Sequence, residues 1–249
     1  GCAPPPDRDV EVLGTPIVGG VPTTGWDPVV MLQSNAGLCS GTVISPDVVL
    51  TAAHCLDGAV APVNVYWCDD YYNVGYDHHM AATDFYPHPD YLVGAATADI
   101  AVVLLPQESP VTPVPINREL ASEDWLDPSN PFTFLGFGVT GYGLADNGVK
   151  REVEIDIDQF YDDVLLYMDK AHNTCFGDSG GPGMTDHAGD WAVAGVNSGG
   201  DGACAQYGIA VEVAFYEAWI DGYTGGWDPY ADDDADGWTV GDGDCDDAD

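Results

Sequence analysis

Residues 176–182 read Phe-Gly-Asp-Ser-Gly-Gly-Pro, and this stretch decides the fold that we expect. Ser179 stands in a turn rich in glycine, which has no side chain to keep a substrate carbonyl at a distance. Consecutive backbone N–H groups in such a turn can also point at one spot, where they would stabilise negative charge on an oxygen atom. The segment therefore suits a serine that meets a substrate carbonyl group.

Three further segments lie upstream of this one. Residues 51–55 read Thr-Ala-Ala-His-Cys, residues 98–102 read Ala-Asp-Ile-Ala-Val, and residues 17–20 read Ile-Val-Gly-Gly. Together with the serine segment, in the order His, Asp, Ser, they resemble the chymotrypsin/trypsin-type serine proteases from residue 17 to about residue 223. Four segments in the family's order are far more specific than any one of them alone.

The resemblance implies a role for each matching residue. Ser179 is expected to be the nucleophile, and His54 the general base that later protonates the leaving amine. Asp99 is expected to be the buried carboxylate that fixes the imidazole tautomer. The backbone N–H groups of Gly177 and Ser179 are expected to form the oxyanion hole, and the chemistry needs no cofactor.

The resemblance also implies a substrate pocket, whose walls are expected from Asn173, Thr174, Asn197, Ser198, Gly199 and Gly208. Asn173, six residues before the serine, is expected at the floor, where a neutral side chain favours uncharged substrates over Arg or Lys. Asp201 lies in a longer segment than the family's and could bring a carboxylate to the rim, so substrate preference stays open. We expect Asn197 to donate a hydrogen bond to Asp99, in place of the serine that normally does so.

Activation is expected to follow the family's switch. There, cleavage before Ile17 frees an α-amino group that pairs with the carboxylate of Asp178 and so organises the oxyanion hole and the pocket. The residue before Ile17 is Pro16, which makes a poor site for a trypsin-like activator. Either an unusual protease cuts there or the chain is an inactive precursor, and we expect a zymogen.

The chain has seven cysteines in contexts rich in Gly and Pro, without a C-x-x-C pair. This usage favours structural disulfides in an exported protein over a zinc site or a cytosolic redox motif. The resemblance implies the pairs Cys39–Cys55 and Cys175–Cys204. We expect a secreted protein or one held at a bacterial cell surface.

The remaining cysteines are Cys2, Cys68 and Cys245, so at most one more intramolecular bridge can form. Residues 1–6 read Gly-Cys-Ala-Pro-Pro-Pro and resemble the end of a bacterial lipoprotein cleavage site. A lipid anchor at Cys2 and a disulfide at Cys2 are both open. The first would leave Cys68–Cys245 as the bridge, and the second would give Cys2–Cys68.

The charge balance excludes other classes of partner. Five Lys and Arg stand against 42 Asp and Glu, which gives a formal net charge of −37. Such a polyanion repels nucleic-acid backbones and anionic membrane surfaces, whose binding needs clustered basic residues. The longest apolar runs are too short to cross about 30 Å of hydrocarbon. We therefore expect protein or peptide substrates, no nucleic acid, no transmembrane segment and a monomer.

Short apolar runs separated by Gly, Pro, Asn and Asp fill residues 17–213 and predict an all-β fold. The resemblance makes this two six-stranded antiparallel β-barrels with the active site between them. A short C-terminal helix is predicted where Val213, Tyr216, Trp219 and Ile220 recur at three- and four-residue spacing. The expected divisions are a leader at 1–16, a protease domain at 17–223 with barrels at 17–115 and 116–223, and an acidic tail at 224–249.

The tail carries a candidate metal site. Asp232, Asp234 and Asp236 alternate and are followed by Gly237, as oxygen ligands would be in a loop around Ca²⁺. The segment resembles Asp-rich, Ca²⁺-binding repeats of secreted bacterial proteins, and a solvated acidic tail is the equal alternative.

We expect a secreted serine endopeptidase that works through an acyl-enzyme. The hypothesis from another class is a catalytically silent binding or surface module on the same fold, with a Ca²⁺-binding tail. The complete His, Asp and Ser set favours the enzyme, because drift usually destroys such a set first.

Overall fold

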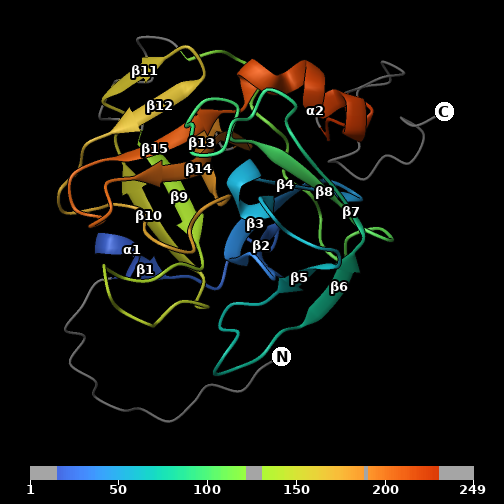
Figure 1. The fold of residues 1–249 in the computed structure, drawn as a ribbon, viewed down its shortest axis with the longest axis horizontal. Helices are drawn as coiled ribbons and strands as arrows, with labels where there is room; N and C mark the ends of the chain where they lie inside the picture. The colour runs from blue at the N-terminus through green and yellow to red at the C-terminus, as the bar shows by residue number, and fades with distance from the viewer. Residues whose placement is uncertain (1–15, 122–130, 188–189, 230–249) are drawn as a thin grey trace.

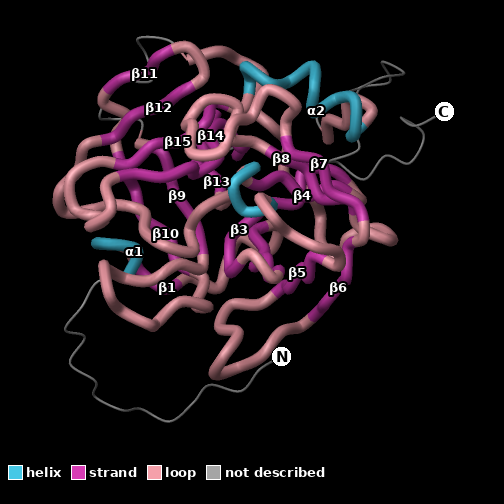
Figure 2. The backbone as a smooth tube through the Cα atoms, in the orientation of Figure 1, coloured by secondary structure: helices cyan, strands magenta, loops and turns pink. Residues whose placement is uncertain are grey.

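The structure is a computed structural model and describes residues 16–121, 131–187 and 190–229. Strands dominate it, and helical turns are few and short (Figures 1 and 2). The described strands form two sheets, and each ladder between neighbouring strands is antiparallel. The expected all-β architecture with a chymotrypsin-like pair of barrels is confirmed.

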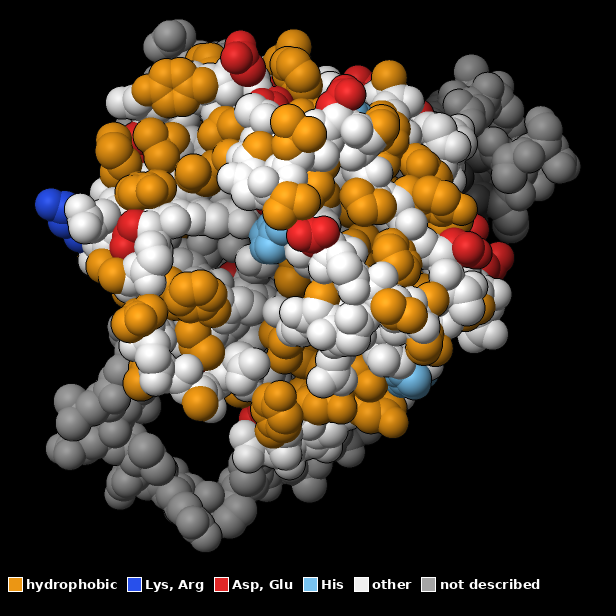
Figure 3. All heavy atoms as spheres, in the orientation of Figure 1, with side chains coloured by type: hydrophobic (Ala, Val, Ile, Leu, Met, Phe, Trp, Pro, Cys, Tyr) orange, Lys and Arg blue, Asp and Glu red, His pale blue; other side chains and the backbone are white. Residues whose placement is uncertain are grey.

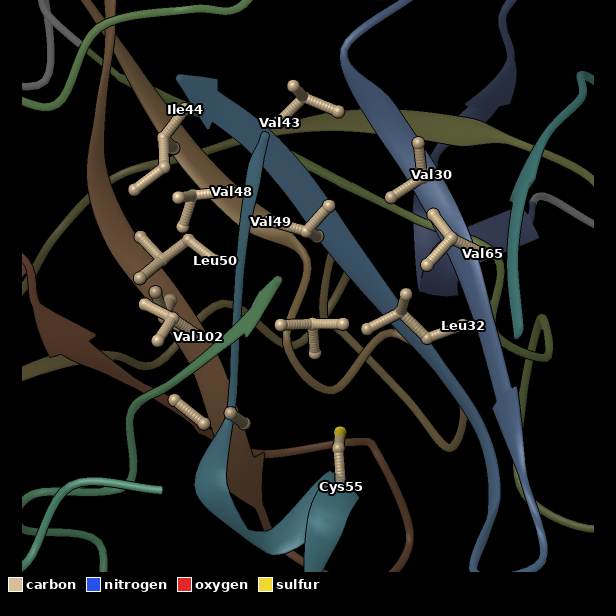
Figure 4. Close-up of a cluster of buried hydrophobic side chains, with 14 of the residues drawn as sticks. Val30, Leu32, Val43, Ile44, Val48, Val49, Leu50, Cys55, Val65 and Val102 are labelled. Atoms are coloured by element: carbon tan, nitrogen blue, oxygen red, sulfur yellow. The ribbon is translucent and has the colours of Figure 1, made fainter. Parts of the chain in front are cut away.

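The smaller sheet has seven strands, all from the first half of the described chain. In spatial order they are β6 (His78–Ala82), β5 (Val63–Trp67), β2 (Val29–Ser34), β3 (Gly37–Ser45), β4 (Val48–Thr51), β8 (Ala101–Leu104) and β7 (Asp84–Pro87). All four residues of β4 are buried, as are the first four of β2. Strands that read as continuous apolar runs are buried on both faces, and Figure 4 shows Val30 and Leu32 of β2 in one cluster with Val48, Val49 and Leu50 of β4.

The larger sheet has eight strands. In spatial order they are β1 (Val21–Pro22), β10 (Arg151–Ile155), β9 (Phe132–Gly136), β13 (Pro182–His187), β14 (Asp190–Gly200), β15 (Gly208–Glu212), β12 (Val164–Tyr167) and β11 (Gln159–Tyr161). The counts of seven and eight differ from the expected six and six. Two-residue β1, three-residue β11 and four-residue β7 all lie on sheet edges, and they are too short to show an alternating pattern in the sequence.

Short helical segments complete the described fold. They are α1 (Pro16–Gly19), the 3-10 turns η1 (Ala53–Leu56) and η3 (Ala214–Tyr216), and α2 (Glu217–Thr224). The last two cover the predicted C-terminal helix, with Ile220 fully buried against the core. Arg118 fixes α2 through ion pairs with Glu217 and with Asp221, the latter at 3.0 Å. No helix in the described ranges has both the length and the apolar character that crossing a membrane requires.

Candidate active site

His54 comes from the smaller sheet. It lies in η1, one turn after β4 ends, and the next residue, Cys55, is joined by a disulfide to Cys39 of β3. The bridge ties the turn to the neighbouring strand, which limits the positions that the imidazole can take. The side chain of His54 is 32% exposed, so its outer edge faces solvent.

Asp99 lies beneath His54 and is almost fully buried. One carboxylate oxygen is 2.7 Å from His54 Nδ1, and the other accepts the backbone N–H of His54 at 2.8 Å. The oxygen facing Nδ1 also accepts the Ser198 hydroxyl at 2.6 Å. A carboxylate with three donors is held in one orientation, and it fixes the proton of the imidazole on Nδ1.

This contact corrects one expectation. Asn197 was expected to donate to Asp99, but Ser198 does so instead. The side chain of Asn197 turns away, and its Oδ1 atom lies 2.8 Å from both the Tyr167 hydroxyl and Thr174 Oγ1. Adjacent residues of a strand face opposite sides, so Ser198 faces Asp99 where Asn197 faces Tyr167; the register of β14 against β15 shifts at this point, between Asn197 and Gly199.

Ser179 comes from the loop before β13 of the larger sheet. Its carbonyl accepts the N–H of Ser40 in β3 at 2.8 Å, which joins the loop to the smaller sheet. Gly180 follows at φ +81°, and a Cβ there would lie 2.1 Å from Thr51 Oγ1 and 2.4 Å from the Ser40 carbonyl. Both the conformation and the close approach therefore require glycine. Ser179 and His54 line the same cavity of about 310 Å³.

The backbone around Ser179 leaves two donors unused. Within the described residues, no hydrogen bond uses the N–H of Gly177 or of Ser179. Gly177 has φ +100°, and a Cβ there would come within 2.9 Å of Gly138 Cα. Backbone N–H groups in proteins are almost always hydrogen-bonded. The unused N–H groups of Gly177 and Ser179 can therefore bind the oxygen of an incoming substrate.

Asp178 lies beneath this loop and is completely buried. Its carboxylate accepts the N–H of Gly138 at 2.7 Å and that of Cys175 at 2.9 Å. No cationic nitrogen among the described residues lies within ion-pair distance of it. Burial raises the pKa of Asp178 to about 7, against the two backbone donors and the more distant Arg151, which lower it.

Ile17, the expected partner of Asp178, is also completely buried. The next residue, Val18, accepts a hydrogen bond from the N–H of Asn173 at 2.8 Å, so the segment after Pro16 packs against the loop that precedes Ser179. Ile17 has φ +38°, a region that β-branched residues strongly avoid. The linked Pro16–Ile17 peptide therefore holds an unfavourable backbone conformation.

The expected pocket residues do not all line one space. Thr174, Asn197, Ser198 and Gly199 line the cavity beside Ser179, but Asn173 and Gly208 are not among its walls. A disulfide joins Cys175 to Cys204 across the cavity. Asp201 reaches the rim, yet its carboxylate accepts the N–H groups of Ala203, Ala205, Gln206 and Tyr207 in its own loop. These backbone donors lower the pKa of Asp201 to about 2.

Two residues of this region were missed at the sequence level. Tyr167 bonds to the pocket residues from β12, and nothing near it in the sequence marks it. Asp163 accepts the N–H of Ala98 at 2.8 Å and also bonds to the Tyr216 hydroxyl, so it anchors the backbone just before Asp99. The bonds of Asp163 span 65 and 53 residues of chain and those of Tyr167 span 7 and 30, and no local motif reports any of these contacts.

Other expectations fall partly or wholly outside the described residues. Cys68 is buried and in no disulfide with a described residue, and burial raises the pKa of its thiol to about 12. The positions of Cys2, Cys245 and the aspartates 232, 234 and 236 are not described. Cys39, His54 and Cys55 bring their sulfur and nitrogen atoms close together, but both sulfurs are in the disulfide and cannot bind a metal.

Figure 3 shows that Lys and Arg are confined to the left edge of the face in view.

The comparisons with known proteins agree with this geometry. The family model described as Trypsin matches residues 17–220. Tryptase from Mus musculus is 33% identical over 249 residues, covering 83% of this chain and 88% of the relative. Trypsin from Saccharopolyspora erythraea is 32% identical, covering 68% of this chain and 78% of the relative. Brachyurin from Leptuca pugilator is 29% identical, covering 84% of this chain and 99% of the relative.

Proposed function

The chain belongs to the trypsin family and is a serine endopeptidase, and from this premise we propose that it is made as a secreted zymogen that cleaves through His54, Asp99 and Ser179. The observation that carries the proposal is the 2.7 Å contact between His54 and Asp99 in a cavity that Ser179 also lines. Trypsin-family catalysis needs no cofactor, and the substrates are proteins or peptides.

In the proposed reaction, each of these groups has one role. Ser179 Oγ attacks the peptide carbonyl while the free nitrogen of His54 takes its proton, because Asp99 keeps the other nitrogen protonated. The Gly177 and Ser179 N–H groups then bind the oxygen that becomes negative. His54 returns the proton to the leaving amine, and water releases the acyl group from Ser179 by the same route in reverse.

Activation requires cutting the bond before Ile17. The buried carboxylate of Asp178 lacks a cation, and a new ammonium group on Ile17 would supply one. Cutting also removes the unfavourable φ of Ile17, because that torsion needs the carbonyl carbon of Pro16. Both effects favour a cut chain with an ordered loop at residues 173–179.

A fusion protein whose cleavage leaves Ile17 first tests this proposal. Peptidase activity should rise by orders of magnitude after cleavage, since the oxyanion hole and the pocket depend on Asp178. A matched chain with Asp178→Asn should gain little from the same cleavage. Equal activity of the uncut and cut chains would show that the switch does not operate here.

Export, a monomeric state and the tail remain proposals from the sequence. A chain truncated after Gly225 should keep its peptidase activity and lose the calcium binding that calorimetry detects in the full chain. Calcium binding that survives the truncation would exclude Asp232, Asp234 and Asp236 as ligands. The silent-module hypothesis is not favoured, because the nucleophile, base and carboxylate are all present and correctly ordered.

A further inference from the structure

Tyr167 occupies space next to the substrate cavity. It ends β12 and pairs directly with Gly208 of β15, and its side chain is completely buried. A Cβ on Gly208 would lie 2.1–2.4 Å from the ring and hydroxyl of Tyr167. The phenol ring therefore lies over the glycine and fills the room that the missing side chain leaves.

The hydroxyl of Tyr167 connects the ring to the cavity wall. It lies 2.7 Å from Thr174 Oγ1 and 2.8 Å from Asn197 Oδ1, and these two atoms are themselves 2.8 Å apart. Thr174 and Asn197 line the cavity beside Ser179, whereas Tyr167 does not. The three oxygens thus form a closed triangle, with Tyr167 behind it and the cavity in front.

The triangle marks where the cavity ends. Asn173, at the deeper position, is 1% exposed and does not line the cavity, and Gly208 is covered by the ring. The volume of about 310 Å³ is at the low end for ligand sites and also includes the space around His54 and Ser179. A long side chain that entered beside Ser179 would meet Thr174, Asn197 and then the phenol.

We propose that Tyr167 closes the bottom of this cavity and restricts the enzyme to substrates with a small, uncharged side chain on the residue whose carbonyl Ser179 attacks. Alanine, serine and valine fit this description. Aromatic side chains are excluded by size, since the ring and the triangle stand in their way. Lysine and arginine find no carboxylate at the closed end of the cavity, where Thr174, Asn197 and Tyr167 lie; Asp201 lies at the rim, and its carboxylate accepts the N–H groups of its own loop.

A simpler explanation is that Tyr167 is only a core residue that covers Gly208. Its ring centroid lies 4.7 Å from that of Phe134. That explanation accounts for the ring but not for a hydroxyl that donates to Asn197 and lies within 2.7 Å of Thr174 Oγ1, both of them cavity residues. It also predicts no effect of Tyr167 on the choice of substrate.

The test rests on the proposed function and uses the full chain cut before Ile17. A small organophosphate first titrates the fraction of active Ser179. Four peptides that differ only in the attacked residue, Ala, Val, Phe or Lys, are then compared by kcat/KM. We expect Ala and Val to exceed Phe and Lys by about 100-fold or more, the scale on which a closed pocket discriminates.

Two variants identify the residue responsible. Tyr167→Ala should raise the Phe to Ala ratio by at least about tenfold, because the ring no longer fills the cavity end. Tyr167→Phe keeps the ring and should keep the exclusion of Phe peptides. An unchanged Phe to Ala ratio in a folded Tyr167→Ala chain would overturn the inference.

The outcomes separate the two proposals. A titratable enzyme that cleaves the Phe or Lys peptide within tenfold of the Ala peptide contradicts the role of Tyr167 and leaves the proposed function intact. This result needs only the unsubstituted chain, so it decides even if Tyr167→Ala does not fold. A chain that does not react with the organophosphate overturns the proposed function, and the inference with it.

Discussion

Two neighbouring residues of β14 face two different polar clusters. Ser198 bonds to Asp99 and so belongs to the cluster that includes His54. Asn197 bonds to Tyr167 and Thr174, on the other side of the same strand. Successive side chains of a strand point to opposite faces, and one strand therefore separates the reacting groups from the groups that we propose select the substrate.

The two clusters also differ in how they meet solvent. The first ends in a His54 side chain that is 32% exposed, where a proton can pass to and from a substrate. The second ends in a completely buried Tyr167, where nothing can enter without displacing the ring. We conclude that changes in the first cluster should alter the rate for every substrate, and changes in the second should alter the choice among substrates.

The largest expected effect is in the first cluster. His54→Ala should lower kcat by at least about 10⁴-fold for all peptides alike, because no other group can take the Ser179 proton. Steady-state rates on the Ala and Phe peptides measure this loss. The His54→Ala chain does not react with the organophosphate, so its concentration is taken from the amount of folded protein. A loss that differs greatly between the two peptides would break the division between the clusters.

The second test concerns the loop that carries Thr174, whose fold depends on Asp178. A folded-state pKa of about 7 exceeds the usual value near 3.8, so the native uncut chain binds more protons than the unfolded chain between these limits. The free energy of unfolding should fall as pH rises from about 4 to 7, by at most about 1.4 kcal/mol per pH unit from this group.

Denaturant titrations of the uncut chain at several pH values measure this slope. Asp178→Asn should remove its share of the slope, and cutting before Ile17 should also reduce it, because an ammonium partner favours the ionised carboxylate. An Asp178→Asn chain with the full slope would assign the pH dependence to other groups.

The smallest effect comes from the neighbours on β14. Ser198→Ala removes one of three donors to Asp99 and should lower kcat about fivefold for all substrates, as expected for the loss of about 1 kcal/mol. Asn197→Ala should instead shift the ratio of Phe to Ala cleavage, because Tyr167 and Thr174 lose their shared acceptor. Equal effects of the two changes on rate and ratio would merge the clusters into one.

The sequence predicted the first cluster better than the second. The segments around His54, Asp99 and Ser179 are short and local, and the structure brings His54 and Asp99 into direct contact and His54 and Ser179 into one cavity. The role expected of Asn197 was wrong by one residue, because Ser198 bonds to Asp99, and a one-residue error exchanges the two faces of a strand.

Tyr167 could not be predicted, because its significance depends on the pairing with Gly208, forty-one residues later in the chain. In the sequence it reads as an ordinary strand residue. The same limit applies to Asp163, whose partner Ala98 lies in the other half of the chain. Contacts between distant parts of the chain, rather than residue type, decided both.

The proposed function depends on Ser179 being a nucleophile that His54 activates. Reaction of the chain cut before Ile17 with a small organophosphate, followed by peptide mapping, tests it most directly. We expect one adduct per chain, on Ser179, together with loss of peptidase activity, and no adduct in His54→Ala or in the unfolded chain. An active chain without this adduct, or with an adduct on another serine, would contradict it.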